Sequence, residues 1–405
     1  MARKPPPLRP HLLARGKRAA QANEFLGKAW DKGWLPPPQL DPESLWNIAA
    51  KGLGARTETA EHGGRRTEDV ADFRERLVRL CDSLRSEADL NPLGQAMAYG
   101  QITRTLRNRL ALGELWSKRP ELLATRLAPP IIVIGHMRSG TTRIHKLLAA
   151  DPAHSHTRYC DAYHPVPARR GVNRAKAALE LAMLGVLNPW MQSIHPMAPA
   201  EVEEELAWLS AALHHSIYES QWRIPSYSAF SEASDPAPIY REFLRMLQTD
   251  AAMRGVAEKP RVLKVPAFAE DLATLLALFP DARLVLADRD HEAVLKSAVS
   301  LAANQMAIQS DTCDLAQIEA LWRHKIAFRE ARLGAALADW QGRVARASFD
   351  ELNTDWEGAI ARIYADLGLS LTPTALVAMR QVMAASESGH HHAHAAQLAV
   401  FAQSG

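Results

Sequence analysis

Residues 129–150 read PPIIVIGHMRSGTTRIHKLLAA. The short β-branched run at 131–134 follows two prolines and predicts a strand that is buried on both faces. Gly135 and Gly140 bracket a tight loop, and the apolar residues after it recur three and four positions apart, which predicts a helix. A strand, a glycine loop and a helix start together form an anion cradle, because backbone N–H groups and the positive end of the helix dipole converge there.

The spacing of this loop is close to that of a nucleotide-triphosphate loop, G-x-x-x-x-G-K-[ST], but Thr141 occupies the lysine position. That lysine normally reaches the β- and γ-phosphates, so its absence argues against hydrolysis of ATP or GTP. The loop carries its positive charge at Arg138 instead, and a guanidinium can bind two phosphate oxygens at once. We therefore expect a nucleotide with a terminal 5′-phosphate group at this loop. A strand–turn–helix corner without a ligand is the alternative.

The composition is that of an ordinary globular protein, with 405 residues, 47% of them hydrophobic, and a net charge of +3. This length suits one large α/β domain with an added helical layer, or two domains. The even charge balance argues against nucleic-acid binding, and no run of eighteen apolar residues is present to span a membrane. Three widely separated cysteines favour neither a disulfide framework nor a zinc site, so we expect a cytoplasmic protein.

Strand and helix patterns alternate after residue 129, which predicts a parallel β-sheet flanked by helices. Further short strands are expected at 261–265, 283–287 and 343–348. A helix is expected at 201–215, because its acidic start would suit the helix dipole. The expected organisation is a basic arm and helical extension over 1–125, an α/β domain over 126–388 and a flexible histidine-rich tail over 389–405.

A second phosphate-binding feature lies at 284–301. Arg289 follows the carboxyl end of an expected strand, which is where ligands bind in open α/β sheets. Ser297 comes eight residues later, about two turns into the next helix. The two side chains are able to hold one phosphate from two sides, although a surface arginine and a capping serine would give the same pattern. Together with the glycine loop, they predict two phosphate sites on one sheet.

Three motifs now point to a known family. They are RSGTT at 138–142, K-x-P at 264–266, and FPDARLV followed by RD between 279 and 290. The chain resembles bacterial sulfotransferases that use 3′-phosphoadenosine 5′-phosphosulfate (PAPS), and the resemblance runs from about residue 41 to residue 369. It implies a P-loop sulfotransferase-like fold and transfer of a sulfuryl group to a hydroxyl or amine of a small molecule or glycan.

The resemblance also implies roles for single residues. Arg289 and Ser297 would hold the 3′-phosphate of PAPS. The residues that would hold the 5′-phosphosulfate are Arg138, Ser139, Gly140, Thr141 and Thr142.

Sulfuryl transfer needs a base for the proton of the acceptor and a positive group near the leaving phosphate, whereas a metal is not required. Asp161 matches the position of a glutamate in the family, which implies that it is the base. His164 and His195 are the alternatives, and His195 precedes an acidic run that would tune its pKa. Lys264 stands at the carboxyl end of an expected strand, beside the loop, where it would neutralise the leaving group.

Several questions stay open at this stage. The histidines at 390–394 sit in an alanine-rich tail that either contacts the cofactor phosphate or is flexible. Apolar and aromatic residues between 190 and 230 indicate either an apolar acceptor pocket or core packing. A kinase-like phosphotransferase and a non-catalytic nucleotide-binding protein are the rival functions. The sequence does not determine the identity of the acceptor. It also does not determine the oligomeric state, and a homo-oligomer is one alternative.

Overall fold

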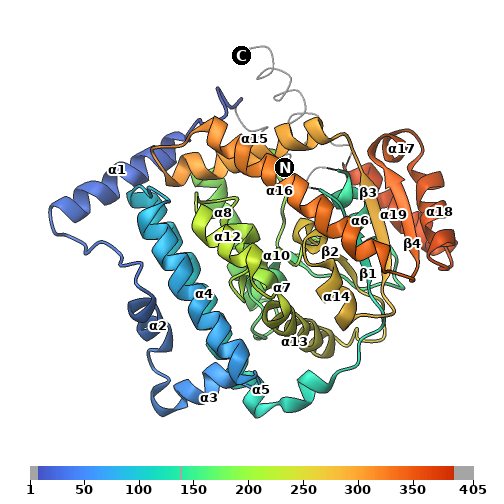
Figure 1. Cartoon of the computed structure of the whole chain (residues 1–405), viewed down its shortest axis with the longest axis horizontal. Helices are drawn as coiled ribbons and strands as arrows, with labels where there is room; N and C mark the ends of the chain where they lie inside the picture. The colour runs from blue at the N-terminus through green and yellow to red at the C-terminus, as the bar shows by residue number, and fades with distance from the viewer. Residues whose placement is uncertain (1–7, 137–138, 387–405) are drawn as a thin grey trace.

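A four-stranded parallel sheet lies at the centre of the part of the chain that the computed structural model describes, residues 8–136 and 139–386. Its strands are β1 (Ile131–Ile134), β2 (Val262–Lys264), β3 (Arg283–Asp288) and β4 (Val344–Ser348). They are ordered β2-β1-β3-β4, so the chain changes direction across the sheet between β1 and β3 (Figure 1). All four strands were expected from the sequence, which confirms the α/β fold class.

Helices make up most of the remaining structure. Those before the sheet are α1 (Lys17–Asp31), α2 (Pro42–Ala50), α3 (Thr57–His62), α4 (Thr67–Ser86) and α5 (Pro92–Lys118). Those between β1 and β2 are α6 (Thr141–Ala150), α7 (Tyr159–Tyr163), α8 (Val172–Leu187), α9 (Met191–Ile194), α10 (Leu206–Ser210), α11 (His215–Tyr218), α12 (Pro225–Ala233) and α13 (Ala237–Arg254). Those after β2 are α14 (Leu272–Leu278), α15 (His291–Gln309), α16 (Leu315–Ala338), α17 (Phe349–Thr354), α18 (Trp356–Asp366) and α19 (Pro373–Ser386).

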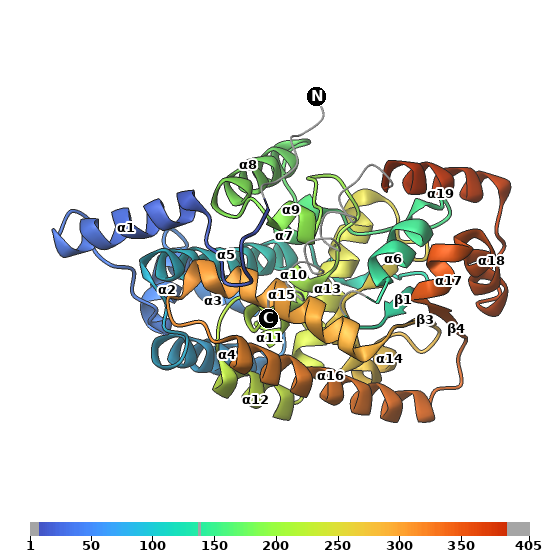
Figure 2. The same ribbon diagram turned by 90° about the horizontal axis from the view of Figure 1, so that it is seen from above.

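The sheet is buried on both faces, as its unbroken apolar strands predict. Ile132 and Ile134 pack in one hydrophobic cluster with α13 and α14. Ile131 and Val133 point to the opposite face, because successive side chains of a strand alternate, and pack with α6, α18 and α19. The result is a three-layer arrangement with helices on each side of the sheet (Figure 2).

A separate helical layer is formed by α2, α4 and α5, and it packs on residues that lie between β1 and β2. Leu213, Tyr218 and Trp222 belong to the same hydrophobic cluster as these helices. A buried ion pair also joins the layer to α13, since Arg65 Nη2 lies 2.7 Å from Glu242 Oε1. The N-terminal helices are therefore held to the rest of the chain by both apolar packing and charge.

The segment LNPLG at 90–94 joins α5 to the end of α15. The Asn91 side chain accepts a hydrogen bond from the Gly94 N–H at 2.8 Å and caps α5, and Pro92 begins the helix. The Asn91 backbone N–H donates to the Gln309 carbonyl oxygen at 2.9 Å. A Cβ atom at Gly94 would lie 2.1 Å from that same oxygen, so only glycine allows the two helices to come this close.

The expected helix at 201–215 is wrong. Residues 201–205 precede the short helix α10, and α11 begins only at His215. The acidic side chains do not gather around a helix start, because Glu203, Glu204 and Glu205 turn inward to cationic and N–H partners described below. Burying a carboxylate without a partner is costly, so these partners decide the local conformation.

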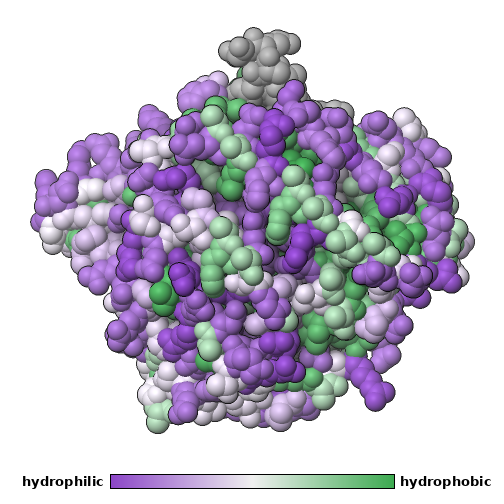
Figure 3. Space-filling view, in the orientation of Figure 1, coloured by the Kyte–Doolittle hydropathy of each residue, from purple (hydrophilic) through white to green (hydrophobic). Residues whose placement is uncertain are grey.

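Hydrophilic residues cover most of the face shown in Figure 3, with smaller apolar patches between them. Within the described ranges, none of the helices has the length and apolar character that a bilayer crossing needs.

Candidate active site

The loop after β1 is shaped by two glycines. A Cβ atom at Gly135 would lie 2.7 Å from Ser139 Oγ and 2.8 Å from the Ala287 carbonyl oxygen. Gly140 has φ +91°, a conformation that glycine adopts at little cost, and it leads directly into α6. The first backbone N–H groups of a helix have no partner within that helix, so the start of α6 offers donors at the loop. The predicted residue Arg138 lies outside the described residues.

His136 anchors the start of this loop to α16. Its Nε2 atom lies 3.2 Å from Glu330 Oε1, and His291 Nε2 lies 2.5 Å from the same oxygen. Burial is the largest influence on the His136 ring and lowers its pKa. Ser139 closes the turn, because its hydroxyl donates to the His136 carbonyl oxygen at 2.7 Å.

Arg289 lies at the carboxyl end of β3 and contacts the segment SFDEL at 348–352. Its guanidinium stands over the Phe349 ring, 4.0 Å from the ring centroid, and burial lowers its pKa. Phe349 also packs at the glycine loop, since its Cδ2 atom would be 3.3 Å from a Cβ at Gly140. Arg289 is thereby held beside the loop. Ser297 is buried on α15, the helix that follows Arg289.

Lys264, the last residue of β2, lies against the start of α6. Its Nζ atom donates to Thr142 Oγ1 at 3.1 Å and forms an ion pair with Glu204. Its backbone N–H donates to Glu205 Oε2 at 2.9 Å. Lys264 is buried, so its positive charge is fixed in position beside the loop, where the sequence predicted it.

The half-buried His195 forms a second pair, with the buried Glu203. The imidazole Nε2 atom lies 3.2 Å from Glu203 Oε1. Burial is the largest single influence on His195 and lowers its pKa, but the charge and hydrogen bond of Glu203, together with the charge of Glu204, outweigh it, so the pKa is raised overall. Burial acts on Glu205 without an ion pair of comparable strength and raises the pKa of that carboxyl to about 7. The acidic run at 201–205 therefore contains a carboxylate that forms an ion pair, Glu203, and a carboxyl that binds its proton more tightly than usual, Glu205.

Asp161 and His164 have partners of their own. The Asp161 carboxylate is bound in bidentate fashion by Arg158, with Nε–Oδ2 at 2.6 Å and Nη2–Oδ1 at 3.0 Å. Arg254 Nη1 lies 3.6 Å from the same group. His164 Nε2 lies 3.2 Å from Glu180 Oε2. The structure thus brings His195 and Lys264 together, and it places Asp161 and His164 in separate ion pairs.

A cavity of about 140 Å³ connects the paired groups. Thr142, Lys264, His195, Glu203 and Glu204 line its polar side, whereas Asp161 and His164 are missing from the described residues that line it. The apolar side is formed mainly by Met191, Ile194, Met197, Ile217, Leu301 and Trp322. Much of this lining comes from the apolar stretch between 190 and 230. We call this space the acceptor cavity.

The described residues fit a nucleotide donor that carries one phosphate at its 5′ position and another at its 3′ position. One phosphate group would suit the loop after β1. The loop is packed too tightly for a Cβ atom at Gly135, and it places the N-terminus of α6 beside the Lys264 cation. Arg289 and Ser297 lie on the β3–α15 unit, across the point where the strand order reverses. The His-rich tail at 389–405 lies outside the described residues, so its contact with a phosphate stays a prediction.

Sequence reasoning missed Glu203, Glu204 and Phe349. The run EVEEE at 201–205 was a usable signal, because consecutive carboxylates in a largely apolar segment need cationic partners. Those partners, His195 and Lys264, are reached only by folding, since Lys264 lies sixty residues further on in the chain. Phe349 gave no signal of its own.

Comparisons with known proteins agree with this geometry. Residues 129–373, more than half of the chain, match the model of a family described as the sulfotransferase family. A stretch of 267 residues is 27% identical to omega-hydroxy-beta-dihydromenaquinone-9 sulfotransferase Stf3 of Mycobacterium bovis. It covers 63% of this chain and 67% of that relative, and the same figures hold for Stf3 of Mycobacterium tuberculosis.

Two solved structures have similar folds. Sulfotransferase STF1 from Mycobacterium tuberculosis H37Rv superposes with a TM-score of 0.74 at 31% identity, over 84% of this chain and 92% of that one. Sulfotransferase STF9 from Mycobacterium avium gives a TM-score of 0.75 at 22% identity, over 86% of this chain and 89% of that one. The second likeness is one of fold alone.

Proposed function

We propose that this chain, which belongs to the sulfotransferase family, moves a sulfuryl group from PAPS to the hydroxyl of an apolar small molecule. The observation that carries the proposal is the acceptor cavity, whose polar side joins Thr142, Lys264 and the His195–Glu203 pair while its other walls are apolar. The relative Stf3 is named for a hydroxylated menaquinone, which supports a hydroxyl on an apolar acceptor. An apolar lining suits such an acceptor better than a glycan.

Each donor-binding role is assigned to residues of this chain. The residues proposed for the 5′ side are Arg138, Ser139, Gly140, Thr141 and Thr142. Arg289 and Ser297 are proposed for the 3′-phosphate, because they lie on the other side of the strand-order switch. When bound, PAPS supplies a sulfuryl group attached to its 5′-phosphate. Lys264 contributes a fixed positive charge at that end, where it stabilises negative charge on phosphate oxygens.

His195 is the base that the geometry favours. It lines the acceptor cavity, and Glu203 holds its Nε2 atom and stabilises the imidazolium that forms when it accepts a proton. Asp161 is less suited to this role, because Arg158 already occupies both of its carboxylate oxygens. Glu204 lines the same cavity but is paired with Lys264. His195→Ala should therefore lower turnover more than Asp161→Asn or Glu204→Gln.

Ligand binding tests the donor assignment directly. We expect 3′-phosphoadenosine 5′-phosphate to raise the melting temperature, since a ligand at about 100 times its Kd adds about 2.7 kcal/mol of stability. Mg-ATP should give a much smaller shift, because Thr141 replaces the phosphate-binding lysine. A larger shift with Mg-ATP would contradict the proposal and favour a phosphotransferase.

The same assay separates the two phosphate sites. Arg289→Ala should weaken binding of 3′-phosphoadenosine 5′-phosphate about 10- to 100-fold, which is the usual loss of one charged hydrogen bond. Binding of adenosine 5′-phosphate, which lacks the 3′ group, should change little. Arg346→Ala is the matched control, because Arg346 is an exposed arginine on β4 near the same edge. Equal losses for both nucleotides would show that Arg289 is structural.

A further inference from the structure

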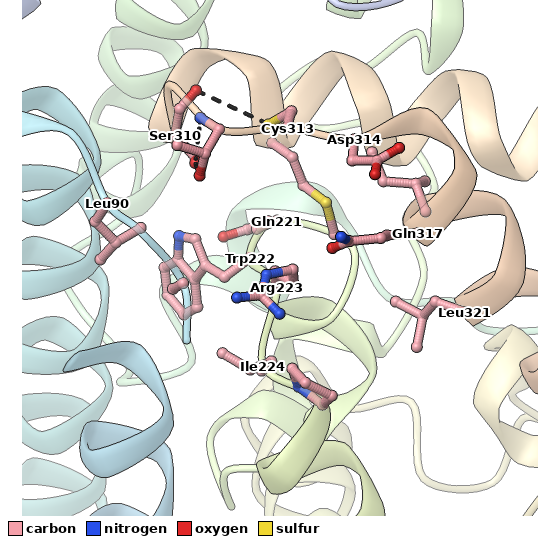
Figure 4. Close-up of a pocket in the computed structure, with 15 residues that line it drawn as sticks. Leu90, Gln221, Trp222, Arg223, Ile224, Ser310, Cys313, Asp314, Gln317 and Leu321 are labelled. Atoms are coloured by element: carbon pink, nitrogen blue, oxygen red, sulfur yellow. Dashed lines mark hydrogen bonds between the residues drawn. The ribbon is translucent and has the colours of Figure 1, made fainter. Parts of the chain in front are cut away.

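A second cavity, of about 160 Å³, is drawn in Figure 4 and shares the lining residue Gln221 with the acceptor cavity. We call it the distal cavity. Figure 4 shows Trp222 and Ile224 facing it from one side and Gln317 and Leu321 of α16 facing it from the other. Its lining is mainly apolar, with Leu90, Trp222, Ile224, Met306, Ile318 and Leu321 as the main contributors. The polar end of the Trp222 indole is already satisfied, because Nε1 donates to Gln309 Oε1 at 2.8 Å.

The helices α15 and α16 line both cavities. Gln221 lines both. On α15 the lining passes from Gln305 in the acceptor cavity to Met306 in the distal one, and on α16 from Trp322 to Leu321. The lined length of α16 runs from residue 317 to residue 329, which corresponds to about 18 Å of helix. We call the two cavities together the channel, because both lie along α16 and Gln221 lines each of them.

We infer that the distal cavity binds the far end of a long apolar chain whose hydroxyl lies in the acceptor cavity. This inference rests on the proposed function and specifies its acceptor class as a long-chain alcohol. An apolar cavity of about 150 Å³ stays dry and accepts a six-carbon ring, so each compartment has room for several carbon atoms. Burying those carbons supplies affinity, whereas a short alcohol fills only the compartment beside His195.

Direct binding of primary alcohols of increasing chain length, measured by calorimetry, tests the inference. Each buried methylene should tighten binding to the wild-type protein about fourfold. Leu321→Trp, which fills the distal cavity from a half-buried position, should abolish this gain for the longer alcohols and leave the short ones unchanged. Gln317→Trp, which fills the same cavity from one turn earlier on α16 and does not line the acceptor cavity, should do the same. Val377→Trp adds the same bulk at an exposed site on α19 and should bind like the wild type.

The inference is overturned if affinity does not depend on chain length in the wild type, or if both channel variants bind long alcohols as tightly as Val377→Trp does. Two filling variants are used so that misfolding of one leaves the test intact. The readout needs neither the donor nor turnover. A chain-length effect without any sulfated product would therefore retain the channel and reject the proposed function. The reverse result would retain the function and reject the channel.

A different feature, the outer face of α8, carries a second inference. Val172, Leu179, Met183 and Val186 are all exposed, Leu179 by 64%, and their spacing places them on one side of the helix. The opposite side of α8 is used for packing, through Ala177 and Leu181. Figure 2 shows α8 at the edge of the molecule, and it contacts α1 there.

Positive charge surrounds this face. Arg169, Arg170, Arg174 and Lys176 are exposed at and just before the start of α8, and the one acidic residue of the helix, Glu180, is paired with Arg104 and His164. Apolar side chains bordered by unopposed basic ones are typical of helices that lie in the interface of an anionic membrane.

We propose that the α8 face docks on an anionic lipid surface. The position of the face supports this partner, because α9 follows α8 directly and lines the acceptor cavity through Met191 and Ile194. A membrane-bound enzyme would thus meet apolar acceptors where they are dissolved. A second copy of this chain is the other occupant that an apolar face would suit.

Sedimentation with phosphatidylglycerol vesicles tests the docking. The wild-type protein should bind these vesicles at low salt and bind phosphatidylcholine vesicles at least tenfold more weakly. The double variant Leu179→Glu with Met183→Glu should lose at least tenfold in vesicle affinity, whereas Val78→Glu, an exposed site on α4, should not. Unchanged vesicle binding by the double variant would overturn the proposal. The proposal would also be overturned if the wild-type protein failed to bind vesicles, was a dimer by light scattering, and became a monomer in the double variant. The face would then be an interface between two copies of the chain.

Discussion

At the scale of single residues, the imidazole of His195 is subject to two opposing influences. Burial favours its neutral form, whereas the carboxylates of Glu203 and Glu204 favour its charged form and together prevail, so the pKa is raised. A base works in its neutral form, so activity should rise with pH through a pKa above the ordinary value for histidine. The dependence of activity on pH therefore gives the pKa of the proposed base, His195.

Glu203→Gln should move this rise of activity with pH, the acid limb of the pH profile, to lower pH. The substitution removes the negative charge that stabilises the imidazolium and leaves burial, which lowers the pKa of His195. The measurement is kcat/KM against pH for the wild type and the variant. His195→Ala should lower kcat by about 10²–10⁴ and remove the limb altogether. An unchanged limb in Glu203→Gln would mean that another group titrates.

Of the two glycines in the loop after β1, Gly135 has the less space for a side chain. In Gly135→Ala, the new Cβ would lie 2.7 Å from Ser139 Oγ and 2.8 Å from the Ala287 carbonyl oxygen, so the backbone must shift. We expect a loss of about 1–3 kcal/mol in unfolding free energy, the usual result of overpacking, together with weaker binding of 3′-phosphoadenosine 5′-phosphate. Urea denaturation and titration calorimetry measure the two effects.

Gly185→Ala is the control for that substitution. Gly185 lies in α8 with open space around its Cβ position, so alanine there should stabilise the protein by about 0.5–1 kcal/mol through helix propensity. If Gly135→Ala behaves like Gly185→Ala, the loop is not as tightly packed as described.

At the scale of elements, the sequence predicted whatever depended on local pattern. The apolar runs at 131–134 and 283–287 identified their strands, and Gly135 and Gly140 identified the loop, because each signal lies within a few residues. The segment 201–215 failed for the opposite reason. Its acidic residues fit a helix start locally, but the distant Lys264 and the half-buried His195 determine where they lie.

The buried pair between Arg65 and α13 gives a prediction at this scale. Burial raises the pKa of Glu242, but the charges of Arg65 and Arg109 outweigh it and lower the pKa to about 2. Glu242→Gln would leave both buried arginines without a counter-charge, so we expect a loss of about 3–5 kcal/mol in unfolding free energy. Urea denaturation checks this value.

Glu24→Gln is the matched control, because its partner Lys28 forms an exposed pair on α1. It should leave stability unchanged within error, since exposed ion pairs contribute little. A loss for Glu242→Gln as small as that of the control would show that the helical layer is held by apolar packing alone.

At the scale of the whole molecule, the α/β core and the helical layer contribute differently. The stretch that matches the sulfotransferase family, 129–373, contains every described residue that lines the acceptor cavity. The N-terminal helices support it from outside, through α5 and the cluster around Trp222. The sequence identified the family and the glycine loop after β1. It did not reach the cavities, because residues from α9, α11, α15 and α16 meet there only in the folded chain.

The central claim is sulfuryl transfer from PAPS to an alcohol at the His195–Lys264 cavity. Mass spectrometry of the product, after incubation of the protein with PAPS and a long-chain primary alcohol without added metal, tests it most directly. We expect a sulfate ester whose rate of formation falls at least 100-fold in His195→Ala and in Lys264→Ala, while Asp161→Asn retains most of the activity. The claim would be contradicted by undiminished rates in both cavity variants, by loss of activity in Asp161→Asn alone, or by a phosphate ester formed from ATP in place of the sulfate ester.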